Sequence, residues 1–165
     1  TRMDQMRYQV VPVELGIREY IEDQIERLEE LAYQKKIKLE FLPGDEHKII
    51  SDVMLLGRAF SNVTSNCIRY AKEMVQISVE ENGEQLKITI RDDGPGIAED
   101  DLPHLFDRFY KGKNGNHGLG LSIAKRSMEY MGGNIVAEAS PDGAIFTIIL
   151  PQDCRSFAVE EWTEV

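Results

Sequence analysis

Hydrophobic residues recur along the chain with two different periods, and each period predicts a different type of secondary structure. Apolar residues three or four positions apart, with charged residues between them, indicate amphipathic helices that bury one face. Three such helices are expected: one that starts at Leu15, one that runs from a cap at Ser51 or Asp52 to about Ala71, and one over Gly118–Met131. Gly132-Gly133 is expected to end the third helix.

Other segments alternate apolar and polar residues, which is typical of strands with one buried face. Strands are expected near Val10–Val13, Ile37–Phe41, Met74–Val79, Leu86–Ile90, Ile135–Ala139 and Ala144–Leu150. Asn82-Gly83 and Pro141-Asp142-Gly143 are turn signals that join the later strands into two hairpins. Hairpins separated by helices predict an α+β fold, with one mixed sheet covered on one face by about three helices.

The length and composition of the chain fit one globular domain. With 165 residues and a hydrophobic content of 42%, the chain can bury a substantial core. We expect a linker over residues 1–9, a single domain over residues 10–151 and a C-terminal tail over residues 152–165. The linker shows no clear period, and the mainly acidic tail carries two aromatic residues, Phe157 and Trp162.

The charge balance and the cysteines exclude several classes of function. With 29 acidic and 19 basic residues the formal net charge is -10, which argues against a surface that binds nucleic acid. Cys67 and Cys154 lie far apart, so neither a disulfide framework nor a zinc site is indicated, and a reducing cytoplasm fits best. No apolar run approaches the roughly 20 residues that span a bilayer, so we expect a soluble piece, which could still come from a membrane protein.

The second predicted helix carries a set of polar residues along one side. Asn62, Asn66, Arg69 and Tyr70 follow one another at spacings of four, three and one, which keeps them on neighbouring positions of the helix surface. A side-chain amide offers an oxygen to a hard cation such as magnesium, and Arg69 can meet a phosphate oxygen. The alternative is that the two asparagines are ordinary surface or capping residues.

A second candidate motif, Asp92-Asp93-Gly94-Pro95-Gly96, follows the predicted strand Leu86–Ile90 directly. A carboxylate at the end of a strand can accept a hydrogen bond from an exocyclic amine, and the glycines let a flat base approach the backbone. The alternative is a simple turn, because aspartate, glycine and proline are the usual turn residues.

A third motif, Gly118-Leu119-Gly120-Leu121, opens the third predicted helix. Glycines before a helix expose backbone N–H groups and the positive end of the helix dipole, which together bind anions. The motif matches neither a P-loop nor a dinucleotide fingerprint, and a flexible hinge is the alternative.

Between these motifs lies Leu105–Lys111, followed by a polar, glycine-rich loop over residues 112–117. We expect Phe106 and Phe109 to anchor this segment and to leave Arg108 and Lys111 free to reach a nucleotide. The loop is expected to act as a lid, and the alternative is a surface connection with solvated cations.

The order of the four motifs resembles that of the histidine-kinase branch of a superfamily of ATPases that also includes gyrase, MutL and the large heat-shock chaperones. In that family's vocabulary the motifs resemble the N box (Asn62–Tyr70), the first glycine box (Asp92–Gly96), the F box (Phe106–Tyr110) and the second glycine box (Gly118–Leu121). The resemblance covers about Val10 to Pro151, and the combination of motifs is highly specific.

The resemblance implies a two-layer α/β sandwich, the Bergerat ATP-binding fold, with ATP between the helices and under the lid. It implies that Asp92 binds the adenine amino group and that Asn66 coordinates Mg2+ with Asn62 beside it. It places three cations at the phosphates, namely Arg69, Arg108 and Lys111. Further nucleotide contacts are implied for Tyr70, Gly94, Gly96, Ile97, Phe109, Tyr110, Gly118, Leu119, Gly120, Leu121 and Thr147.

The chain departs from the family pattern at three places. Arg69 stands where lysine is common, which keeps the charge and changes its geometry. The lid between Lys111 and Gly118 is short. Gly143-Ala144 stands where the family often has Gly-Thr, so the third glycine box is the least secure match.

Asn62 favours phosphoryl transfer over hydrolysis. Hydrolytic members of the superfamily are similar to one another in having a glutamate one helical turn before the magnesium asparagine. Asn62 stands at this position, and its amide cannot act as a general base. None of His47, His104 and His117 has the surroundings of the family's phospho-acceptor histidine. The resemblance therefore implies a protein-histidine kinase whose acceptor histidine lies on a separate dimerisation domain.

Partners and location also follow from the resemblance. A response-regulator aspartate is expected to receive the phosphoryl group, and the piece is expected to be a monomeric cytoplasmic part of a homodimeric, membrane-anchored sensor. Two alternatives are a serine kinase of the anti-sigma type, which shares the motifs, and a module that senses nucleotide without transferring a phosphoryl group.

Overall fold

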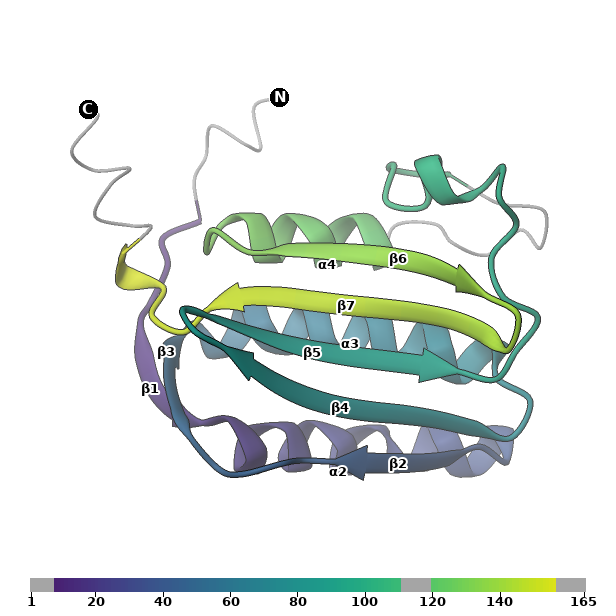
Figure 1. Cartoon of the computed structure of the whole chain (residues 1–165), viewed down its shortest axis with the longest axis horizontal. Helices are drawn as coiled ribbons and strands as arrows, with labels where there is room; N and C mark the ends of the chain where they lie inside the picture. The colour runs from purple at the N-terminus through teal and green to yellow at the C-terminus, as the bar shows by residue number, and fades with distance from the viewer. Residues whose placement is uncertain (1–7, 111–119, 157–165) are drawn as a thin grey trace.

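A computed structural model describes residues 8–110 and 120–156 and shows two layers, a five-stranded sheet and a layer of helices (Figure 1). The sheet has the order β2-β4-β5-β7-β6, in which β2 runs parallel to β4 and the other neighbours are antiparallel. Its strands are β2 (Lys38–Leu42), β4 (Met74–Asn82), β5 (Gln85–Asp92), β6 (Asn134–Ser140) and β7 (Gly143–Pro151). The mixed sheet predicted from the sequence is confirmed.

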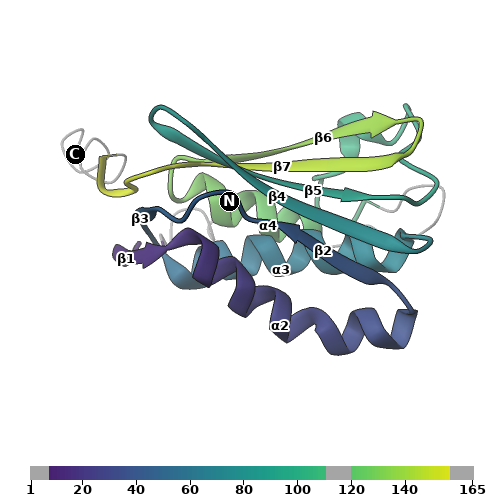
Figure 2. The same ribbon diagram turned by 60° about the horizontal axis from the view of Figure 1, so that its bottom comes forward.

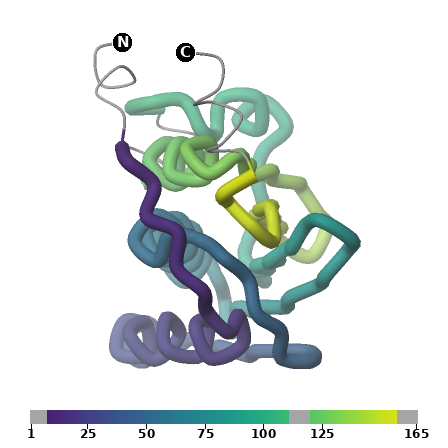
Figure 3. Tube along the Cα trace, turned by 90° about the vertical axis from the view of Figure 1, so that its left-hand side faces the viewer, coloured from purple at the N-terminus to yellow at the C-terminus, as the bar shows by residue number. Residues whose placement is uncertain are grey.

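Three helices cover one face of this sheet, and Figure 2 shows the other face without a covering layer in the described part of the chain. They are α2 (Ile17–Lys35), α3 (Val53–Tyr70) and α4 (Gly120–Glu129), with a short 3-10 turn, η1, at Leu102–His104. Viewed along the helix axes, α3 lies between α2 and α4 (Figure 3). No helix within residues 8–110 and 120–156 has both the length and the apolar character needed to cross a bilayer.

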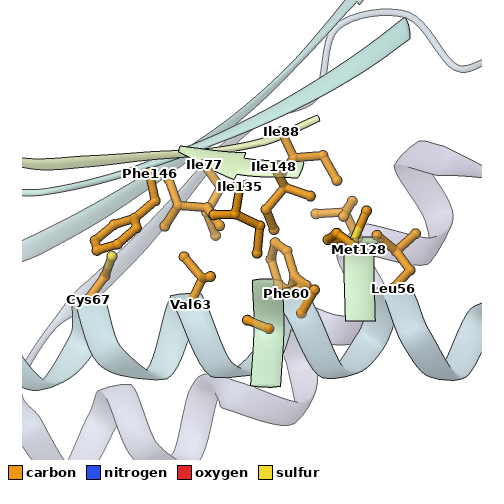
Figure 4. Close-up of a cluster of buried hydrophobic side chains, with 14 of the residues drawn as sticks. Leu56, Phe60, Val63, Cys67, Ile77, Ile88, Met128, Ile135, Phe146 and Ile148 are labelled. Carbon is orange, nitrogen blue, oxygen red and sulfur yellow. The ribbon is translucent and has the colours of Figure 1, made fainter. Parts of the chain in front are cut away.

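Helix α3 carries the centre of the core. Leu56, Phe60, Val63 and Cys67 are spaced four, three and four residues apart, so they lie on one face of the helix and are fully buried. Figure 4 shows their side chains pointing at apolar side chains of the sheet, among them Ile77, Ile88, Ile135, Phe146 and Ile148. Burial of such side chains stabilises the fold by about 1.5 to 3 kcal/mol each.

The N-terminus of α3 is capped by Asp52, one of the two residues expected there. Its Oδ1 accepts hydrogen bonds from the backbone N–H groups of Met54 and Leu55, each at 3.0 Å. Its Oδ2 accepts a third bond, at 2.9 Å, from the N–H of Val11. The buried carboxylate therefore joins the entering chain to the start of α3.

A second, two-stranded sheet corrects the sequence analysis at the N-terminus. The predicted strand near Val10–Val13 is shifted to β1 (Val13–Gly16), and α2 starts after it, at Ile17. The antiparallel partner of β1, the strand β3 (Lys48–Ser51), was not predicted. The pairing with β3 sets the position of β1, in which Leu15 lies opposite Ile49. The N–H of Val11, within the predicted strand, is donated to the side chain of Asp52.

Both predicted hairpin turns and the glycine stop of the third helix are present. Gly83 has a φ of 62° in the turn between β4 and β5, and Gly132 has a φ of 78° after α4. Gly133 donates its N–H to the carbonyl of Met128 at 2.8 Å, so the helix ends at Glu129, two residues earlier than expected. The predicted start of this helix at Gly118 lies outside the described residues.

Candidate functional site

A cavity of about 250 Å³ opens between the C-terminal half of α3, the end of β5 and the start of β7. It is lined by Asn66, Tyr70, Asp92, Pro95, Gly96, Ile97, Ala98, Asp101, Ala144 and Phe146. Residues 95–101, which follow the end of β5, form one of its walls. The cavity combines apolar walls with a few convergent polar groups, as sites for small molecules do.

Asp92 is a buried polar group of the cavity that two backbone N–H groups hold in place. It ends β5, is 7% exposed, and its Oδ1 accepts hydrogen bonds from the N–H groups of Gly94 at 3.0 Å and Ala144 at 3.2 Å. Burial raises the pKa of Asp92, and the hydrogen bonds from Gly94, Ala144 and the thiol of Cys67 only partly offset it. The carboxylate is thus fixed in direction and well placed to accept a bond from a ligand.

The neighbouring Asp93 has a different task. Its Oδ1 accepts hydrogen bonds from the N–H groups of Lys72 at 2.7 Å and Glu73 at 3.1 Å. Slight burial raises the pKa of Asp93, and these backbone bonds outweigh it and lower the pKa. Asp93 therefore holds the connection between α3 and β4, and it is not among the residues that line the cavity.

Two glycines allow the backbone segments around Asp92 to come close together. A Cβ atom on Gly94 would overlap the carbonyl oxygen of Tyr70, and one on Gly143 would overlap the carbonyl oxygen of Asp92. Gly143 also has a φ of 142°, a conformation that other residues rarely adopt. The third glycine box, the least secure match in the sequence, therefore lies directly against Asp92.

Helix α3 places the predicted polar residues in three different environments. Asn66 and Tyr70 line the cavity, and Asn66 is 6% exposed. Asn62 lies one turn before Asn66, is half-buried, and is not part of the cavity wall. Arg69 is exposed to solvent, so its guanidinium is available to a ligand at the rim.

The F box is anchored by one of its two phenylalanines. Phe106 packs edge-on against Phe146, with ring centroids 6.5 Å apart, and the Nζ of Lys125 lies 4.9 Å from the Phe106 centroid. The expectation that Phe109 is a second anchor is wrong, because its side chain is 65% exposed. Its φ of 63° turns the side chain out of the fold, and the guanidinium of Arg108 lies 5.3 Å from its ring centroid.

Tyr110 is linked to a cavity residue that the sequence analysis missed. Its Oη donates a 2.6 Å hydrogen bond to Oδ1 of Asp101, which is 6% exposed and lines the cavity. No periodic pattern in the sequence marks Asp101 as buried, and its hydrogen-bond partner Tyr110 lies nine residues further along the chain. The cavity wall also contains residues to which no nucleotide contact was assigned from the sequence, namely Pro95, Ala98, Ala144 and Phe146.

The remaining predicted contacts are placed away from the cavity or outside the described residues. Thr147 is corrected: it alternates along β7 with the buried Phe146 and Ile148, so it lies on the face of the sheet opposite the helices. Ala144, three residues earlier on the same strand, lines the cavity, and Thr147 does not. Gly120 begins α4 and Leu121 is buried in the core, and neither lines the described cavity, whereas Lys111, Gly118 and Leu119 fall outside the described residues.

Comparison with known proteins identifies relatives for the greater part of the chain. Residues 51–153 match the family model described as histidine kinase-, DNA gyrase B- and HSP90-like ATPase. The chain is 44% identical over 108 residues to the signal transduction histidine-protein kinase AfsQ2 of Streptomyces coelicolor, covering 62% of this chain and 20% of the relative. It is 32% identical over 158 residues to the sensor histidine kinase CssS of Bacillus subtilis, covering 92% of this chain and 34% of the relative. The chain thus spans 20% and 34% of the length of these two relatives.

Solved structures of similar fold include histidine kinases. The mycobacterial sensor histidine kinase MprB superposes with a TM-score of 0.74 and 28% identity, covering 86% of this chain and 97% of that chain. The histidine kinase ThkA in complex with the response regulator protein TrrA gives a TM-score of 0.77 at 22% identity, covering 88% of this chain and 43% of that chain. The second likeness is one of fold alone, and both support the two-layer sandwich.

Proposed function

The chain belongs to the family of histidine kinase-, DNA gyrase B- and HSP90-like ATPases, and from this we propose that it is the ATP-binding catalytic domain of a sensor histidine kinase. In this proposal the domain transfers the γ-phosphoryl group of ATP to a histidine on a separate dimerisation domain. The group then passes to an aspartate of a response regulator. The two curated relatives are sensor kinases, which favours this function over the serine kinase and over the nucleotide sensor.

The observation that carries the proposal is that a buried carboxylate and a buried amide line the same apolar cavity. Asp92 is fixed by two backbone N–H groups and would accept a hydrogen bond from the amino group of adenine. Ile97, Ala144 and Phe146 supply apolar surface for the flat base. Asn66, which lines the same cavity from α3, would lie nearer the phosphates.

Asn66 would hold a magnesium ion in this cavity. The side chain of Asn66 offers an amide oxygen, a hard ligand of the kind Mg2+ prefers, and magnesium in such sites takes most other ligands from phosphates and water. When bound, the ion would neutralise charge on the triphosphate. Arg69 and Arg108, both exposed, would hold the phosphates in line with the incoming histidine.

Asn62 favours phosphoryl transfer to another group over the hydrolysis of ATP. It lies one helical turn before Asn66, at the position where hydrolytic relatives would need a base, and its amide cannot take a proton from water. The nucleophile is therefore expected to come from another domain. We place this domain in the cytoplasm, as part of a membrane-anchored, homodimeric sensor.

Incubated alone with labelled ATP, the chain is expected to bind the nucleotide while neither labelling itself nor releasing phosphate rapidly. The cavity residues Asn66, Tyr70 and Asp92 come from this chain, so binding needs no second domain. Addition of an acceptor domain with its histidine should produce label on that domain, and an acceptor with alanine for histidine should stay unlabelled. Stable label on this chain alone, or brisk phosphate release without acceptor, would overturn the proposal.

Asn66→Ala is expected to slow transfer to an added acceptor domain roughly tenfold, a loss typical of a disturbed metal site. The rate of label transfer at saturating magnesium and ATP is the measurement. Asn134→Ala is the matched control, because Asn134 is an exposed asparagine at the other end of β6 from the cavity and should transfer normally. A wild-type rate in Asn66→Ala would remove Asn66 from the metal site.

A further inference from the structure

One hydrogen bond joins the wall of the cavity to the turn that carries Arg108. The Oη of Tyr110 donates to Oδ1 of Asp101 at 2.6 Å, and Asp101 is both nearly buried and part of the cavity wall. A bond to a charged acceptor is stronger than one between neutral groups. The same bond raises the pKa of Tyr110, so the hydroxyl keeps the proton that it donates.

The turn between these two residues is folded around Tyr110. The ring of His104 stacks on the ring of Tyr110 with centroids 5.3 Å apart, and His104 Nδ1 lies 3.1 Å from Oδ2 of Asp107. The N–H of Tyr110 donates to the carbonyl of Asp107 at 3.3 Å. These contacts fold the segment from Asp101 to Tyr110 into one unit, and the Asp101 carboxylate joins the end of this unit at Tyr110 to the cavity wall.

The backbone beside Tyr110 shows that this unit holds a strained conformation. Phe109 has a φ of 63°, which a residue with a bulky side chain rarely adopts and which persists only where the surroundings impose it. Its ring lies under the guanidinium of Arg108. The orientation of Arg108 therefore depends on Phe109. Phe109 in turn lies next to Tyr110, the residue that Asp101 fixes.

We propose that Asp101 and Tyr110 are positioning residues whose hydrogen bond fixes the turn from which Arg108 reaches a bound triphosphate. The inference rests on the proposed function, in which Arg108 meets the phosphates. It gives Tyr110 a different role from the direct nucleotide contact expected from the sequence, because Tyr110 acts through Asp101. The base, held by Asp92 and the apolar walls, does not depend on this bond.

Tyr110→Phe tests the inference, because it removes the hydroxyl and leaves the ring that stacks on His104. Calorimetry on the 165-residue chain would give the dissociation constants of ATP with magnesium and of adenosine. We expect the affinity for ATP to fall about three- to tenfold, as for the loss of one hydrogen bond, and the affinity for adenosine to stay the same.

Tyr33→Phe is the matched control, since it removes the hydroxyl of a tyrosine that is 84% exposed and lies on α2. Unchanged ATP affinity in Tyr110→Phe would overturn the inference, and so would an equal loss of ATP and adenosine, which indicates a merely structural role. In both cases wild-type binding of ATP would leave the proposed function standing. If the wild-type chain bound neither ATP nor adenosine, the proposed function and the inference would fail together.

Discussion

Asp92→Asn is expected to weaken ATP binding by about 10- to 100-fold, the equivalent of losing a charged hydrogen bond worth roughly 1.5 to 3 kcal/mol. The fold should survive, because the asparagine keeps an oxygen that can accept from the N–H groups of Gly94 and Ala144. What changes is the charge of the acceptor that faces the ligand. Calorimetric titration with ATP, beside a thermal unfolding scan, separates the two effects.

Asp93→Asn is the matched control for this prediction. Asp93 is the next residue in the chain, and its carboxylate accepts from the backbone of Lys72 and Glu73, away from the cavity wall. It should lower thermal stability slightly and leave ATP affinity unchanged. Equal losses of ATP affinity in both variants would mean that the Asp92 effect comes from the loop between β5 and η1, and the adenine contact would be rejected.

Gly143→Ala is expected to lower the free energy of unfolding by about 3 kcal/mol or more, or to prevent folding altogether. The added Cβ would overlap the carbonyl oxygen of Asp92, and neither backbone can move without breaking the pairing of β5 and β7. The φ of 142° adds a conformational cost of its own. Chemical denaturation monitored by circular dichroism would measure the loss.

Gly83→Ala separates the effect of the backbone conformation from that of the contact. Gly83 has a φ of 62° and nothing within 4 Å of a Cβ atom, so its substitution carries the conformational cost of about 1 kcal/mol alone. Gly143→Ala should therefore be the much more destabilised of the two. Similar denaturation midpoints for both variants would show that the close approach to Asp92 adds nothing to stability.

The sheet and the three helices could be predicted because their periods are local properties of the sequence. Helix α3 was anticipated nearly to its ends, since Asp52 is a capping residue and its apolar spacing is regular. Strand β3 could not be, because it has only four residues and its partner β1 lies about 35 residues earlier in the chain. Such short strands are defined by their partner, and no local pattern reveals it.

The candidate site was predictable where a residue's role depends on its own motif. Asp92, Asn66 and Ile97, to which the resemblance gave roles in nucleotide binding, all line the cavity, and those roles stay predictions. The nucleotide contact expected for Thr147 was wrong because successive residues of β7 point to opposite faces of the sheet, and Thr147 lies on the face away from the helices. Asp101 was missed because no spacing in the sequence marks it as buried or pairs it with Tyr110.

Asp52 connects the chain that enters the domain to the helix that lines the cavity. The carboxylate holds the N–H of Val11 with one oxygen and the first turn of α3 with the other. The entering chain is therefore connected directly to the N-terminus of α3. Asn66 lies on the same helix, about 20 Å further along at 1.5 Å per residue, so Asp52 ties the entering chain to the helix that lines the cavity.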